Sequence, residues 1–261
     1  MTETRDLLAV ALTAAERAGV ILLERFGRPA SGVDTKSSPA DLVSDADRDV
    51  EAAILATIRD ARPNDGILAE EGGRSDGAEY RWVVDPLDGT VNFLFGVPHW
   101  CVSIACEDQV GALVGVVHDP SRGETFCAVR GVGATLNDRP LRLEQSDDLG
   151  AALIATGFSY DPRERERQGA TIARLFPTLR DIRRFGAAAL DLAWVGAGRV
   201  DAFFESDLAP WDLAAGALVA AEAGAEIIQI PAGPDGHTGL IVSRPGLSVP
   251  LAAFLAEAGA S

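Results

Sequence analysis

Apolar residues in the first quarter of the chain recur with a helical period. They predict a helix over residues 4–26, ended by Gly27-Arg28-Pro29. A second helix is expected to begin at Ser44, with Asp47 three residues later in a capping-box-like arrangement, and to stop at Pro63. The apolar residues of the first helix lie near one face.

Shorter apolar runs between turn residues predict strands. "GILAEEGG" reads as a short strand, and "CVSIACED", "VGALVGVVHD" and "ETFCAVRG" read as an antiparallel meander. Further on, strand and helix patterns mix: strands are expected within residues 151–158, 200–205, 226–230 and 239–243, and helices within 163–176, 186–199, 211–225 and 249–259.

This order of elements predicts an α+β N-terminal part and a more α/β C-terminal part. A boundary near Gly150 would divide an N-terminal subdomain, residues 1–150, from a C-terminal one, residues 151–261. No linker composition marks that boundary, so we expect the two parts to pack tightly as one unit.

The segment "WVVDPLDGTVNF" places acids where an apolar run stops. Trp82, Val83 and Val84 read as the end of a buried strand, which Pro86 is expected to terminate. Asp85 and Asp88 then lie in a Gly-containing turn, and such a turn can be purely structural.

Other acids share this context. Glu70 follows a short apolar run, and Asp212 begins the helix in "WDLAAGALVAAEAG". If these acids meet Asp85 and Asp88, two carboxylates about 4 Å apart repel by roughly 4 kcal/mol at an effective dielectric near 20. Divalent cations would relieve that repulsion, and a ligand set of oxygens alone favours Mg²⁺ or Mn²⁺.

Composition narrows the function classes. The net charge is −16, which disfavours nucleic acid and anionic membranes as partners. No apolar run is long enough to cross a bilayer, and the N-terminus lacks signal-peptide features, so we expect a cytoplasmic protein. The cysteines, Cys101, Cys106 and Cys127, lack zinc spacing and are expected to be buried, inert thiols.

Two motifs resemble the signatures of the inositol monophosphatase family of Mg²⁺-dependent sugar phosphatases: "DPLDGTVNF" and, later, "WDLAAGALVAAEAGA". "KSSPADLVSDADRDVE", "ILAEEGG" and "FGAAALDLAWVGAGRVDAFFE" also fit, so the resemblance covers nearly the whole chain. It implies a layered αβαβα sandwich, usually dimeric, that hydrolyses a phosphate monoester and is inhibited by Li⁺.

The resemblance also implies metal ligands. Glu70, Asp85 and the Leu87 carbonyl match those of a first Mg²⁺ ion. Asp85, Asp88 and Asp212 match those of a second, and a third, weaker ion is expected near Glu70. Lys36 matches a basic residue near this site, although it could equally be a solvated loop residue.

Catalytic and substrate residues follow from the same resemblance. Thr90, supported by Asp47 and assisted by Glu70, matches the pair that holds the attacking water. Further residues match substrate contacts; they are Asp88, Gly89, Thr90, Ala187, Ala188, Glu205 and Asp212. Asp47 and Glu205 could instead be structural acids.

The substrate and even the functional class stay open. Many relatives have Thr or Ser where this chain has Ala187, so a hydroxyl contact is missing and the assignment to inositol 1-phosphate is weakened. The same chemistry could act on histidinol phosphate, fructose 1,6-bisphosphate or a nucleotide 3′-phosphate. Some family members act through transcription-machinery contacts, so a protein-binding role is the alternative.

Overall fold

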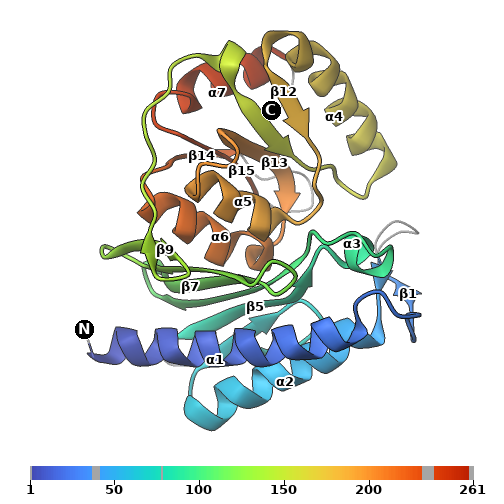
Figure 1. The fold of residues 1–261 in the computed structure, drawn as a ribbon, viewed down its shortest axis with the longest axis vertical. Helices are drawn as coiled ribbons and strands as arrows, with labels where there is room; N and C mark the ends of the chain where they lie inside the picture. The colour runs from blue at the N-terminus through green and yellow to red at the C-terminus, as the bar shows by residue number, and fades with distance from the viewer. Residues whose placement is uncertain (1, 37–41, 78, 231–237, 259–261) are drawn as a thin grey trace.

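The chain folds into five alternating layers of helices and sheets (Figure 1). The computed structural model describes residues 2–36, 42–77, 79–230 and 238–258. Three pairs of helices flank and separate two sheets; they are α1 (Thr2–Arg25) with α2 (Asp45–Ala61), α5 (Ala188–Gly196) with α6 (Pro210–Glu222), and α4 (Pro162–Leu175) with α7 (Ser248–Ala258). The predicted αβαβα sandwich is therefore confirmed.

The first sheet has eight strands in the order β10-β9-β8-β7-β6-β5-β3-β4. Only β3 and β5 run parallel; the other neighbours pair antiparallel, which includes the predicted meander. The strands are β3 (Gly66–Ala69), β4 (Arg74–Ser75), β5 (Arg81–Asp88), β6 (Cys101–Asp108), β7 (Gly111–Asp119), β8 (Glu124–Val129), β9 (Gly133–Leu136) and β10 (Arg139–Pro140).

The second sheet has five strands in the order β12-β11-β13-β15-β14. Here β11 runs parallel to both of its neighbours, whereas β15 pairs antiparallel with β13 and β14. The strands are β11 (Leu153–Thr156), β12 (Asp181–Arg183), β13 (Ala202–Leu208), β14 (Glu226–Ile230) and β15 (Thr238–Ser243). The division into subdomains near Gly150 stays a prediction.

Short elements complete the fold. Strands β1 (Asp34–Thr35) and β2 (Leu42–Val43) form a separate antiparallel pair, and helix α3 (Thr90–Leu94) follows β5. One 3₁₀ turn, Leu149–Ala151, precedes β11, and another, Phe176–Thr178, precedes β12. In the part of the chain that the structure describes, no helix is long and apolar enough to cross a membrane.

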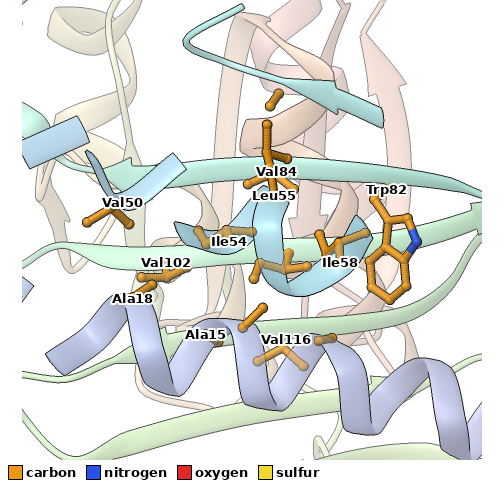
Figure 2. Close-up of a cluster of buried hydrophobic side chains, with 14 of the residues drawn as sticks. Ala15, Ala18, Val50, Ile54, Leu55, Ile58, Trp82, Val84, Val102 and Val116 are labelled. Atoms are coloured by element: carbon orange, nitrogen blue, oxygen red, sulfur yellow. The ribbon is translucent and has the colours of Figure 1, made fainter. Parts of the chain in front are cut away.

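The core beneath the first sheet is almost wholly apolar. Figure 2 shows Ile54 and Ile58 of α2 packed with Ala15 and Ala18 of α1 against the sheet. Trp82 and Ile54 are fully buried, and each such side chain stabilises the fold by about 2–3 kcal/mol. This layer fixes one face of β5 and so positions whatever lies at the end of that strand.

Pro86 does not end β5, contrary to the sequence prediction. The strand continues to Asp88 through a register shift: Asp85 pairs with Ser103 and Asp88 with Cys101, with an irregularity between them. On the other side, β3 stops pairing at Val84. Pro86 therefore lies where neither neighbouring strand needs its missing N–H, which is the circumstance in which a strand tolerates proline.

Candidate active site at the end of β5

The acids predicted to meet do gather at the end of β5. Asp85 and Asp88 are buried on that strand, and Asp212 is the third residue of α6. Burial raises the pKa of Asp85 well above its usual value, and the negative charges of Glu70, Asp88 and Asp212 raise it further. The cluster therefore holds unfavourable negative charge away from solvent.

Asp88 is held by the start of α5. Its carboxylate accepts hydrogen bonds from the backbone N–H groups of Ala189, at 2.7 Å, and Ala188, at 3.1 Å, and lies 3.6 Å from the Cys101 thiol. A helix N-terminus favours an anion. Burial and the charge of Asp191 outweigh these bonds and raise the pKa of Asp88 to about 7.

Backbone N–H groups also orient the other two aspartates. Asp85 Oδ1 accepts from the Leu87 N–H at 2.9 Å, and Asp212 Oδ2 accepts from the Ala209 N–H at 2.7 Å. Burial and the charge of Asp88 raise the pKa of Asp212. Each carboxylate keeps further lone pairs for another ligand, because an ionised carboxylate offers about four acceptor positions.

Thr90 is oriented from α2. Its hydroxyl lies 2.9 Å from Asp47 Oδ1 and 3.0 Å from the Leu87 carbonyl. Asp47 is itself fixed because its Oδ2 accepts from the Ser44 N–H and hydroxyl, which forms the predicted capping box. This rigid support leaves the Thr90 oxygen free to accept a further hydrogen bond.

Gly89 makes the turn between Asp88 and Thr90. Its φ is +92°, in the left-handed region, and a Cβ there would lie 2.9 Å from the His99 carbonyl oxygen. A side chain would therefore be both strained and crowded. Glycine lets the chain leave β5 and start α3 within one residue.

Lys36 brings a cation to the edge of the cluster. Its Nζ lies 2.7 Å from Glu70 Oε1 and 2.5 Å from Glu71 Oε1. Burial alone would lower the pKa of Lys36, but the charges and hydrogen bonds of these glutamates raise it overall. In this structure Glu70 is therefore already paired with a cation, the ammonium group of Lys36.

Glu205 lies on β13, and its negative charge contributes to raising the pKa of Asp212. Its carboxylate packs against Gly157, because a Cβ on that glycine would lie 2.0 Å from Glu205 Oε2. Burial raises the pKa of Glu205 to about 8, and the charge of Arg184 partly opposes that rise. Ala187 is the N-cap residue of α5 and makes no side-chain hydrogen bond. The hydroxyl that Thr or Ser would supply at this position is therefore not replaced by another group of Ala187.

The donor set suits a hard divalent cation. Carboxylates and a backbone carbonyl supply oxygen ligands, and burial without a cation raises the pKa of the three aspartates. Across the described ranges, however, no three His, Cys, Asp or Glu side chains are already arranged around a common metal position. In this structure the carboxylates are held by their backbone partners, and Glu70 is held by Lys36.

Comparison with known proteins identifies the family. The sequence matches the model of the inositol monophosphatase family over residues 3–256. The chain belongs to the inositol monophosphatase family. It is 41% identical to inositol-1-monophosphatase SuhB of Mycobacterium tuberculosis over 95% of this chain and 89% of that protein. It is also 43% identical to the Nus factor SuhB of Escherichia coli over 84% and 83% of the two chains.

Solved structures agree with this assignment. Extragenic suppressor protein suhB from Bartonella henselae superposes with a TM-score of 0.89 at 38% identity, covering 95% of this chain and 98% of that one. An IMPase from Thermotoga maritima gives 0.88 at 31% identity, covering 97% and 98%. Membership in this generally metal-dependent family supports phosphatase activity on phosphorylated substrates.

Sequence reasoning missed several buried polar residues around the family's two motifs. His99 Nε2 lies 2.9 Å from Asp191 Oδ1, and both side chains are buried. Glu51 accepts from the Glu71 and Gly73 N–H groups and so holds the turn after β3. Asp191 and Glu51 stand among apolar residues of predicted helices, which is the one sequence signal that could have found them.

The cysteines largely match their prediction. Cys101 and Cys106 are buried, whereas Cys127 is only partly buried. Burial raises the pKa of the Cys101 thiol well above its usual value and that of Cys127 to about 11. These thiols therefore stay protonated and weakly reactive at neutral pH.

Proposed function

We propose that the chain hydrolyses a small phosphate monoester, with inositol 1-phosphate as the first candidate substrate. The observation that supports this most is the burial of Asp85 and Asp88, with the half-buried Asp212 nearby, beside the hydrogen-bonded pair of Thr90 and Asp47. A buried acid cluster that destabilises the fold is retained where it has a task.

The proposed metal sites use the acids and one carbonyl. Glu70, Asp85 and the Leu87 carbonyl would hold one Mg²⁺, and Asp85, Asp88 and Asp212 a second; a third, weaker ion would lie near Glu70. Bound there, Mg²⁺ or Mn²⁺ supplies Lewis-acid catalysis and neutralises charge on the phosphoryl group. Raised pKa values of the aspartates support the proposal, because a cation would stabilise their ionised forms.

The chain's own groups would position the reactants. Thr90 gives its hydroxyl hydrogen to Asp47, so its oxygen can accept from a water and aim that water's lone pair at phosphorus. Glu70 would accept the proton released from the water. Backbone N–H groups at Gly89 and Thr90 would hold the phosphate, since the first N–H groups of a helix lack partners within the helix.

The leaving group would lie toward the second sheet. We assign its contacts to Glu205, Asp88 and Asp212 and to the backbone at Ala187 and Ala188. Glu205, with its pKa of about 8, can present a protonated carboxyl that donates to a hydroxyl or a carboxylate that accepts from one.

Phosphate release tests the proposal. Purified protein would be assayed with and without Mg²⁺ on inositol 1-phosphate, histidinol phosphate, fructose 1,6-bisphosphate and a nucleotide 3′-phosphate. Mg²⁺-dependent turnover of inositol 1-phosphate with the highest kcat/KM is expected. Preference for another substrate would support phosphate-monoester hydrolysis but replace inositol 1-phosphate as the proposed substrate. No phosphate release from any of the four compounds would reject the proposed activity.

A protein-binding role is the second candidate, because relatives at 43% identity bear the name Nus factor SuhB. A pull-down from cell extract would compare the natural chain with Asp88→Asn. A partner retained by the inactive variant, together with an unchanged cellular phenotype, would favour binding over catalysis. A homodimer, inhibition by Li⁺ and a cytoplasmic location stay predictions from the sequence.

A further inference from the structure

The side chain of Asn92 joins two segments that lie far apart in the sequence. Asn92 is the third residue of α3 and is half-buried. Its Nδ2 donates to the His99 carbonyl at 2.7 Å and to the Phe185 carbonyl at 2.8 Å. Phe185 lies 93 positions further along the chain. Because a primary amide has two N–H groups, each of the two carbonyls receives one of them.

The His99 carbonyl, the first acceptor, lies against the turn to which we assign phosphate binding. A Cβ on Gly89 would lie only 2.9 Å from this oxygen, so the carbonyl fills the space beside the glycine. Asn92 binds the same oxygen from α3, the helix that starts directly after Gly89. In a close-packed interior, movement of that carbonyl would displace the turn as well. Asn92 therefore fixes the surface against which the turn packs.

The Phe185 carbonyl, the second acceptor, belongs to the segment that leads into α5. Gly186 comes next, with a φ of +93°, and a Cβ there would lie 3.3 Å from Asn92 Nδ2. The lack of a side chain at Gly186 thus leaves room for the amide. The first N–H groups of α5 then donate to the Asp88 carboxylate. Asn92 consequently connects α3 with the donors that orient Asp88.

The side chain of His99 makes a second connection to α5. Its Nε2 lies 2.9 Å from Oδ1 of Asp191, in the first turn of that helix, and its ring stacks on the Phe185 ring with centroids 4.9 Å apart. His99 and Asp191 are both buried, so separating them would leave polar groups unpaired. Together with Asn92, these contacts hold α3, the residues before β6 and α5 in one arrangement.

We propose that Asn92 is a positioning residue of the candidate active site. Asp88 and Gly89 are adjacent in the chain, but α5 supports the first and α3 and the His99 carbonyl support the second. Asn92 ties these supports together and so keeps the phosphate-binding turn and Asp88 in one relative geometry. This inference rests on the proposed phosphatase function, in which a displacement of about 1 Å can lower the rate about 100-fold.

Kinetics of two variants test the inference. Asn92→Ala removes both donors without adding charge, and Asn92→Asp keeps the shape of the side chain but loses the donors. In Mg²⁺-dependent phosphate release, we expect kcat to fall about tenfold or more in both, with KM changed less than about threefold, because misplaced groups affect the transition state more than the bound substrate. The loss in Asn92→Ala should be equal at every pH of the activity profile, since an amide does not titrate.

Asn137→Asp is the matched control. Asn137 Nδ2 also donates to a backbone carbonyl, that of Gly123, at 3.0 Å. Asn137 follows β9, and β8, β7 and β6 separate that strand from β5. The same change of side chain at this exposed position should leave kcat and KM unchanged.

Hydrogen exchange of the metal-free protein tests the connection without any activity measurement. In Asn92→Ala, backbone amides should exchange faster both in residues 87–95 and in residues 186–192, although only the first segment contains the substitution. Exchange in α2 should stay unchanged. Faster exchange in α2 as well would indicate a general loss of stability and would contradict a positioning role.

Three further results would overturn the inference. They are a natural kcat in both Asn92 variants, a loss confined to KM, and unchanged exchange in residues 186–192. If the natural chain hydrolyses inositol 1-phosphate in these cases, the proposed function survives and only the role of Asn92 fails. If the natural chain releases no phosphate from any substrate, the proposed function fails, and the positioning role fails with it.

Discussion

Beyond the exposed Arg81, both halves of β5 are buried, yet burial has opposite consequences in the two halves. Trp82 and Val84 pack into the apolar layer formed with α1 and α2, where removal from water stabilises the fold (Figure 2). Asp85 and Asp88, a few residues further along the strand, are equally buried, and burial raises their pKa values. One strand therefore joins a stabilising region to a destabilising one.

The difference shows how the fold supports the candidate site. An acid cluster of this kind lowers the free energy of unfolding, and a large apolar core can offset it. Substitutions in the core should therefore change stability and leave the activity of folded molecules intact. Substitutions among the acids should change activity and leave the fold intact.

Asp88→Asn should give the largest effect. It keeps the side-chain shape but removes a proposed metal ligand, so kcat/KM for phosphate release should fall by more than about 100-fold. The Tm of the metal-free protein should not fall, because a buried negative charge is removed. Asp45→Asn, at an exposed acid paired with Arg48, is the control. Near-normal turnover of the Asp88 variant would refute the site assignment.

Ile54→Ala should give the largest loss of stability. Ile54 is fully buried, so the free energy of unfolding should drop by about 2–5 kcal/mol in urea titration. Ile227→Ala, at a side chain that is 39% exposed, should cost much less. The specific activity of folded molecules should be retained. A parallel loss of kcat would show that packing in the apolar core and activity at the acid cluster are coupled.

Glu205→Gln should change how stability depends on pH. The folded pKa of about 8 lies above the unfolded value near 4.5, so between these values the folded chain holds a proton that the unfolded chain has released. This contribution to stability is full at pH 4.5 and is lost as pH rises to 8. The metal-free Tm should therefore fall less between pH 5 and pH 8 in the variant than in the natural chain. Identical pH profiles would contradict the prediction.

Lys36→Gln should have the smallest effect. It leaves Glu70 and Glu71 without their cation, so the metal-free protein should lose about 1 kcal/mol of stability, measured in urea at low salt. Added Mg²⁺ should restore more stability to the variant than to the natural chain. Arg48→Gln, which breaks an exposed ion pair, is the control. If added Mg²⁺ stabilised the variant and the natural chain equally, Lys36 would have no influence on the proposed metal site.

Local patterns predicted most of the fold correctly. The apolar period located α1 and α2, and the Ser44–Asp47 spacing predicted a capping box that the structure contains. The meander of β6, β7 and β8 followed from alternation and turn residues. Short strands such as β4 and β12 were missed, because two or three residues carry too little periodicity.

The end of β5 was predicted less well, since it depends on neighbouring strands. Pro86 reads as a terminator in the sequence, yet the strand continues because its neighbours stop pairing there. The pair of His99 and Asp191 could not be predicted either, because these residues are far apart in the chain and meet only when α5 packs against the sheet that contains β6.

The sequence by itself determined the helices, the longer strands, the family and the acids of the candidate site, because each depends on local periodicity or on a motif of adjacent residues. Only the tertiary structure decided which acids lie close together and in which direction burial and neighbouring charges shift their pKa values. Desolvation and charge interactions depend on distances between segments that lie far apart in the chain, and those distances exist only in the folded protein.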